Sequence, residues 1–350
     1  MGDRRPRLLA LRIVASAVML AVLLPRVHLS SLLPGWSTAI GLWLLAAVLA
    51  TALGMFLAVL RWRTVLDGMD FGAGRDRDLR ALGHHYLAGQ FVGNFLPSTI
   101  GGDVVRVRRL AQPNGLVADS FASVVLERLT GWVVLPLITL VALAANPGLR
   151  ELGRASALAA AIAVATLVVL AAVLVAVGHP RTGGRLDGSP GWRRFAAAVH
   201  LGVDRLHRHP ASAVAMVATG LAYQVTVTLA AFCAARALGL DAVGLTATLA
   251  FFPAVAVVQV LPVTLGGLGM REWSLVLFLQ PLGVQAGQAM ALGFLVYGLN
   301  LLVSLAGAPS FALGGRRRHA DGLVPAGPVT ADEFAASADP GPHPTVERPR

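Results

Sequence analysis

The sequence predicts an all-α polytopic membrane protein, on three observations: its composition, its long apolar runs and a repeated helix-breaking motif. The chain has 350 residues, of which 56% are hydrophobic and 13% are charged. A soluble domain usually has about 25% charged residues. So few charged side chains cannot cover a surface exposed to water, so we expect an integral membrane protein.

Six apolar runs approach the length of about 20 residues that spans a bilayer as a helix. The first run is short and follows several Arg residues, as a signal peptide would. Pro25 and Arg26 follow it in place of a small-residue cleavage site, so we expect a helix. The predicted spans are Leu8–Leu24, Thr38–Leu60, Phe121–Ala145, Ala155–Val177, Ala211–Ala235 and Ala286–Leu313.

The basic residues predict the orientation of these spans. All 29 are Arg, which suggests a GC-rich bacterial genome and hence a bacterial plasma membrane. They concentrate at the N-terminus, in the loop that carries Arg61 to Arg80, in the loop 178–209 and in the tail from Arg316. Positive residues favour the cytoplasmic side. All four segments are cytoplasmic at once if both termini are inside the cell.

A motif of the form L-P-x-T-[I/L]-G-G-x-x-x-R occurs twice, 165 residues apart. It reads LPSTIGGDVVR at 96–106 and LPVTLGGLGMR at 261–271, inside the apolar regions 81–110 and 242–283. Pro and paired Gly both oppose a continuous helix. We therefore expect each region to form two half-helices of a re-entrant hairpin. The alternatives are one kinked spanning helix in each copy, which would give eight crossings in all, or two extra crossings in each copy.

The two copies predict an inverted-topology repeat with halves at about 8–145 and 155–313. Each half reads span, span, broken segment, span, and the two halves start on opposite sides of the membrane. In transporters built this way, the substrate site lies near the midplane where broken helices of the two halves meet. Residues 1–315 form the predicted transmembrane domain, and 316–350 a disordered cytoplasmic tail.

The start of a half-helix offers unpaired backbone N–H groups to an anion, and Gly permits close approach. Arg106 and Arg271 follow the Gly pairs by about one turn and suit a phosphate-bearing headgroup. Asp103 and Glu272 have no counterpart in the other copy; Asp103 is a candidate helix cap or Arg partner, and Glu272 a partner for Arg271. The substrate-binding candidates are Asn94, Pro97, Thr99, Gly101, Gly102, Asp103, Arg106, Glu127, Arg128, Gln259, Pro262, Thr264, Gly266, Gly267, Arg271 and Glu272.

Glu127 and Arg128 join this set because they lie inside a predicted span. An ionisable pair at that depth is costly and indicates function. Pairing of Glu127 with an Arg of the broken segment is the structural alternative, and the sequence leaves both open.

The sequence carries no catalytic motif, metal-ligand spacing or cofactor fingerprint, so we expect no enzyme activity, no metal and no cofactor. The net charge of +11 fits anionic lipid headgroups better than nucleic acid, because no basic patch interleaved with aromatic residues is present. The single cysteine, Cys233, excludes an intramolecular disulfide.

The strings GNFLPSTIGGDVVRVRRL, VVLERLTGW and LPVTLGGLGMREW resemble the membrane domain of the lysylphosphatidylglycerol synthetase/flippase family, over roughly Leu8 to Leu313. The resemblance implies a helical domain that moves an anionic or glycosylated lipid between leaflets. It does not extend to the cytosolic aminoacyl-transferase domain of the bifunctional members, so the identity of the lipid stays open.

We therefore expect a lipid translocator whose main partner is a membrane lipid with an anionic headgroup. Two other functions remain open: an accessory subunit that presents a lipid carrier to a glycosyltransferase without moving it, and a membrane-embedded lipid transferase. A glycosyltransferase or aminoacyl-lipid synthase partner and a homodimer are further expectations.

The predicted orientation can be tested by cysteine labelling. In a Cys233→Ala background, Arg150→Cys and Asp241→Cys should both react with an impermeant thiol reagent added outside intact cells, because both positions fall in Arg-poor loops. Labelling of either position only after the cytoplasmic face is exposed would contradict the inverted repeat.

Overall fold

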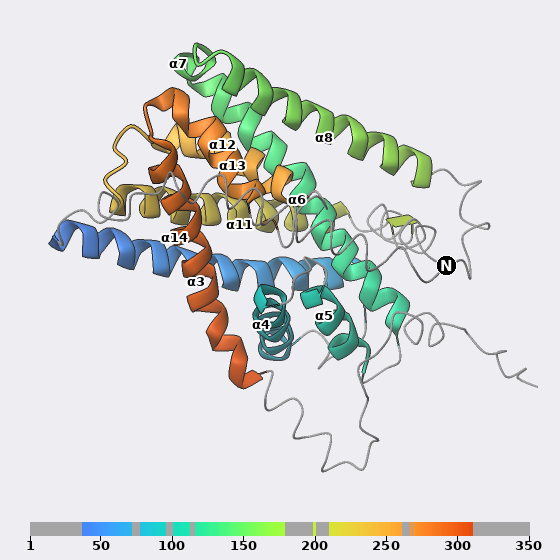
Figure 1. The fold of residues 1–350 in the computed structure, drawn as a ribbon. Coiled ribbons are helices and arrows are strands. Elements are labelled where there is room, and N and C mark those ends of the chain that lie inside the picture. The colour runs from blue at the N-terminus through green and yellow to red at the C-terminus, as the bar shows by residue number, and fades with distance from the viewer. Residues whose placement is uncertain are drawn as a thin grey trace, which may run out of the picture.

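The computed structural model describes residues 37–71, 78–95, 101–112, 116–178, 199–200, 210–260, 267 and 269–310. Every regular element in this part of the chain is helical (Figure 1). Five helices are long and apolar enough to cross a bilayer, which confirms the predicted polytopic all-α fold. They are α3 (Thr38–Gly68), α6 (Val117–Ala145), α8 (Arg154–Gly178), α11 (Pro210–Ala237) and α14 (Ala286–Ser304).

These helices coincide with five of the six predicted spans. The remaining predicted span, Leu8–Leu24, and the tail 316–350 lie outside the described residues. Three elements of three or four residues are also described: α7 (Pro147–Arg150), η3 (Gln280–Leu282) and η4 (Leu305–Gly307).

Helix α3 is longer than the sequence suggested. Its 31 residues extend about 46 Å and end at Gly68 rather than near Leu60. The helix continues because Arg61 and Trp62 are buried at 6% and 0% exposure, with partners inside the bundle. The prediction that Arg61 belongs to a cytoplasmic loop is therefore wrong.

The first broken region is an antiparallel hairpin of α4 (Leu79–Phe95) and α5 (Gly101–Ala111), which pack against each other. Gly102, in the first turn of α5, touches Gly93 and Gly89 of α4. One turn further along α5, Arg106 lies against Gly89 and stacks on Tyr86. Later residues of α5 therefore contact earlier residues of α4, so the two helices run antiparallel.

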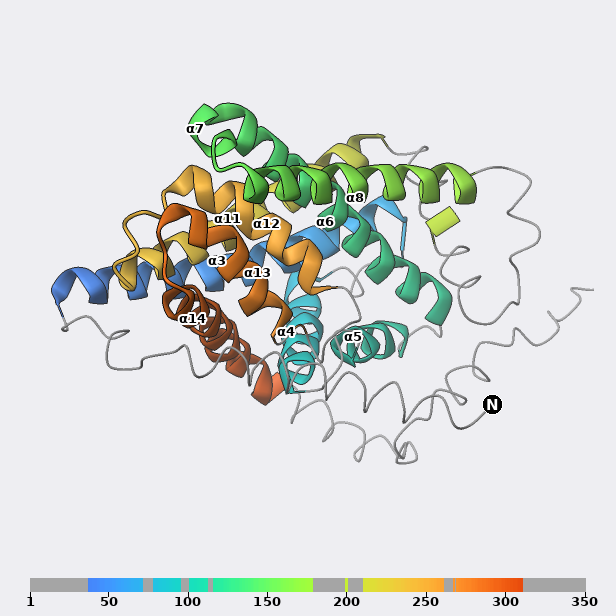
Figure 2. The ribbon, with the colours of Figure 1, turned by 45° about the horizontal axis from the view of Figure 1, so that its top comes forward.

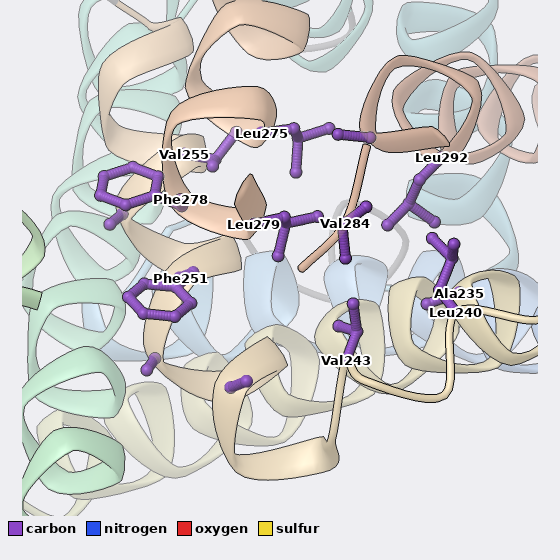
Figure 3. Packing of buried hydrophobic residues seen from close by; sticks show 14 of the residues in the cluster. Ala235, Leu240, Val243, Phe251, Val255, Leu275, Phe278, Leu279, Val284 and Leu292 are labelled. Carbon is purple, nitrogen blue, oxygen red and sulfur yellow. The ribbon is translucent and has the colours of Figure 1, made fainter. Parts of the chain in front are cut away.

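The second broken region has the same form, with α12 (Leu245–Gln259) packed on α13 (Met270–Leu279). Gly267 lies beside the carbonyl of Gln259 near the turn. Farther from the turn, Phe251 and Phe278 stack with ring centroids 5.4 Å apart (Figure 3). Both regions are thus pairs of half-helices, and the alternative of one kinked helix per copy is wrong.

The two halves of the chain repeat their helix boundaries and their packing. Adding the 165-residue offset to the bounds of α4 gives 244–260, close to those of α12. The long helices α3 and α11 lie side by side (Figures 1 and 2). In the first half, α4 packs on α14 and α5 packs on α6. In the second half, the corresponding helix α12 packs on α6, and α13 packs on α14. The opposite membrane orientation of the two halves stays a prediction.

Two apolar clusters hold the hairpins in place. One surrounds α4 and α5 and includes Trp62 and Leu110. The other surrounds α12 and α13 and includes Phe251, Phe278 and Leu279 (Figure 3). Helix α8 lies at the edge of the bundle against α6 (Figure 2). Exposed apolar side chains along α3 form a surface suited to lipid: Leu42, Leu45, Leu49, Leu53 and Phe56.

The tight crossing of α4 and α5 makes a testable prediction at Gly102. A Cβ there would lie 2.3 Å from the carbonyl oxygen of Gly89, a backbone atom that cannot move aside. Gly102→Ala should therefore lower the free energy of unfolding by about 1–3 kcal/mol through overpacking.

Gly83→Ala is the matched control, because it lies in α4 and a Cβ there meets nothing within 4 Å among the described residues. This substitution should be neutral or slightly stabilising. Thermal unfolding of the two detergent-solubilised variants measures the difference, and equal melting temperatures would refute the close crossing.

Candidate functional site

A cavity of about 420 Å³ lies among the helices of the bundle, and both hairpins contribute to its wall. Its volume falls within the range of about 300–1,000 Å³ that is usual for small-molecule sites. Half of the sixteen residues predicted from the sequence line it. They are Asn94, Gly102, Asp103, Arg106, Glu127, Arg128, Gln259 and Arg271.

At the centre of the wall formed by the first half, one carboxylate holds two arginines. Arg61 of α3 donates to Oε1 of Glu127 at 2.6 Å, and Arg106 of α5 donates to Oε2. The side chain of Glu127 is 1% exposed, and those of both arginines are 7% exposed. Removing one partner from such a buried cluster leaves an uncompensated charge, so the cluster ties α3, α5 and α6 together.

Aromatic rings complete the surroundings of these arginines. The guanidinium carbon of Arg106 lies 4.2 Å from the centroid of the Trp62 ring and 4.3 Å from that of Tyr86. Arg61 lies 4.5 Å from the Tyr223 ring. Cation–π contacts of this kind stabilise a guanidinium away from water. Both arginines are therefore held by a carboxylate and by ring faces at the same time.

Asp103 extends the cluster toward the edge of the cavity. It accepts hydrogen bonds from Arg128 at 2.5–2.6 Å and lies 3.6 Å from Arg106. Its place in the first turn of α5 also suits a negative charge, since the helix dipole is positive there. Of the two roles expected for Asp103, the structure shows the Arg partner. The side chain of Arg128 is 45% exposed.

The second copy of the motif is arranged more simply. Glu272 accepts from the N–H of Gly269 at 2.8 Å and from Nε of Arg271 at 2.9 Å. It is completely buried and does not line the cavity, whereas Arg271 does. Arg271 lies 5.2 Å from the centroid of the Tyr297 ring. As expected, Glu272 neutralises Arg271.

Several predicted residues stand apart from the cavity or fall outside the description. Gly101 begins α5, and Gly267 has a positive φ of 80° beside Gln259. Gly102 lines the cavity but also provides the contact with α4, so packing accounts for it. Five further predicted residues lie outside the described part of the chain: Pro97, Thr99, Pro262, Thr264 and Gly266.

The structure adds cavity residues that the sequence analysis did not single out. Arg61 was missed because the end of its helix was placed too early. Gln224 and Asn300 are polar residues inside apolar spans, a signal that was available in the sequence. The others follow from how the hairpins and the long helices pack together; they include Tyr86 and Gln90 of α4, Tyr223 of α11 and Tyr297 of α14. Among the described residues, no group of His, Cys, Asp and Glu could hold a metal ion.

Comparison with known proteins relates this arrangement to one family. The family model described as the lysylphosphatidylglycerol synthase TM region matches residues 8–307. The match therefore covers both hairpins and every described residue of the cavity. Comparisons with curated proteins and with solved structures found no match.

The buried cluster predicts a large loss of stability on removal of its carboxylate. Glu127→Ala leaves Arg61 and Arg106 without their shared partner, so the free energy of unfolding should fall by about 3–5 kcal/mol. Asp241→Ala is the matched control. Its carboxylate is 77% exposed and pairs with Arg236 on the surface, so the change should stay within about 1 kcal/mol. Thermal unfolding in detergent measures both, and equal effects would show that the cluster is not a structural tie.

Proposed function

Because the chain belongs to the lysylphosphatidylglycerol synthase membrane-region family, we propose that it moves an anionic or glycosylated lipid between the leaflets of the plasma membrane. The observation that carries this proposal is the cavity between the two hairpins. Four arginines and two carboxylates line it, and Glu272 lies beside Arg271, which leaves one positive charge in excess. An excess positive charge in a membrane-embedded cavity attracts an anionic headgroup.

In this proposal, Arg271 is the residue that contacts the headgroup. Arg106 is enclosed by Glu127, Asp103 and two rings, so its guanidinium is already engaged in contacts with the protein. Arg271 pairs only with its neighbour Glu272, through Nε and Nη2. Its Nη1 donates no hydrogen bond within the described residues and is left for a phosphate oxygen. Arginine suits this role because its guanidinium fork matches phosphate geometry.

The two motif copies then take different tasks. The copy on α5 builds a rigid wall through Arg106 and Asp103, and the copy on α13 presents Arg271 to the headgroup. Movement between leaflets would follow from rocking of the two halves around the site, as in other repeat transporters.

Measured per folded molecule, Arg271→Ala should slow lipid movement about ten- to hundred-fold, because a charged hydrogen bond contributes about 1.5–3 kcal/mol. Arg271→Lys should restore part of the rate, since the charge returns without the fork. The measurement is the rate at which fluorescently labelled phosphatidylglycerol in proteoliposomes becomes accessible to a reductant outside.

Arg63→Ala is the control, because Arg63 is 44% exposed and lies outside the cavity. A wild-type rate for Arg271→Ala would contradict the role of Arg271. Absence of any movement by the purified wild-type protein would contradict transport itself and favour the accessory-subunit alternative.

A further inference from the structure

Each acidic group at the cavity is already paired with at least one arginine. Asp103 is paired with Arg128 and Arg106, and Glu127 with Arg61 and Arg106. Glu272 bonds to Arg271 and to a backbone N–H. An ammonium group entering the cavity would have to displace an arginine to gain a carboxylate, against an excess of positive charge.

Four aromatic rings at or beside the cavity already lie against arginines. Arg106 stacks on Trp62 and Tyr86, and Arg61 lies over Tyr223. Arg271 lies near the ring of Tyr297. Among the described aromatic residues of the lining, only Trp132 and Phe252 have no arginine over the ring. An aminoacyl headgroup, which carries at least one ammonium, therefore meets carboxylates that are already paired and few free ring faces.

The cavity offers side-chain amides instead. Five of them line it, from α4, α11, α12 and α14: Gln90, Asn94, Gln224, Gln259 and Asn300. Asn94 donates to Ser304, and Asn300 to the carbonyl of Val296, each at 2.9 Å. The other three side-chain amides have no hydrogen-bond partner in the part of the chain that the structure describes.

An amide both donates and accepts hydrogen bonds, as a hydroxyl group does. A phosphate diester only accepts, and an ammonium only donates. A wall with three unpartnered amides and several aromatic rings therefore matches a headgroup with many hydroxyls. The arginine excess supplies the contact for its phosphate.

We infer that the cavity selects a phosphate-linked polyol or sugar headgroup and rejects a cationic aminoacyl headgroup, despite the name of the family. This inference deepens the proposed function and rests on it for the identification of the cavity as the headgroup site. Gln224 of α11 and Gln259 of α12 are specificity-determining residues for the hydroxyls.

The test measures binding separately from transport. Purified protein in detergent is titrated with three water-soluble headgroups: glycerophosphoinositol, glycerol 3-phosphate and deacylated lysylphosphatidylglycerol. Quenching of tryptophan fluorescence reports binding, since Trp132 lines the cavity. Glycerophosphoinositol should bind about tenfold more tightly than either of the others. Equal or tighter binding of the lysyl compound would overturn the inference, and so would equal binding of glycerol 3-phosphate.

Two variants and one control test the role of the amides. Gln224→Leu with Gln259→Leu should bring the affinity for glycerophosphoinositol down to that for glycerol 3-phosphate, whereas Gln280→Leu, on the exposed η3, should change neither. Gln224→Glu preserves the size of the side chain and adds a free carboxylate. It should shift the preference toward the lysyl compound by about tenfold, and an unchanged preference would overturn the assignment of Gln224.

Tail-labelled phosphatidylinositol and lysylphosphatidylglycerol in proteoliposomes then separate the two proposals. Faster movement of phosphatidylinositol supports both. Selective binding without movement of either lipid would contradict the transport function and still support the headgroup selectivity. Faster movement of lysylphosphatidylglycerol would contradict the headgroup selectivity and still support transport.

Discussion

The carboxylate of Glu127 is the constraint on which the rest of the site depends. It is buried inside a helix long enough to span a bilayer and neutralises arginines from two other helices. A charge at that depth is tolerated only with a partner, so α3, α5 and α6 must keep the relative positions that hold the three groups together. Arg106 also pairs with Asp103 and stacks on the rings of Trp62 and Tyr86, so the positions of these three residues depend on it as well.

The same constraint explains why two copies of one motif are not equivalent. The 165-residue offset relates Glu127 to Leu292 and Tyr86 to Phe251, both fully buried in the second apolar cluster (Figure 3). Where the first half has an ionic network, the second has a hydrocarbon core. Arg271 consequently has no carboxylate from another helix and relies on its neighbour Glu272. These departures from the repeat, rather than the repeat itself, fit the proposed division of tasks between a fixed wall and a contact for the ligand.

The sequence was sufficient for the elements that hydropathy and helix breakers determine, namely five spans and two interrupted segments. Pairing of Glu127 with an arginine of the broken segment was one of two possibilities that the sequence left open, and the structure shows it with Arg106. Arg61 was assigned to the wrong environment because composition cannot tell a loop arginine from one that extends a helix into a buried pair. The antiparallel form of the first hairpin depends on the contact of Gly102 with Gly89, which only tertiary structure reveals.

The hairpins also explain how a polar cavity can exist in so apolar a protein. Helices α5 and α13 are only about 16 Å and 15 Å long, half of the roughly 30 Å hydrocarbon thickness. A helix of this length that begins inside the hydrocarbon region would expose backbone N–H groups that lipid cannot satisfy. Glu272 satisfies one of them at Gly269, and Asp103 compensates the positive end of α5. The acids that stabilise the broken helices are therefore groups that pair with the arginines, and the cavity keeps one positive charge in excess beside amides that have no partner among the described residues.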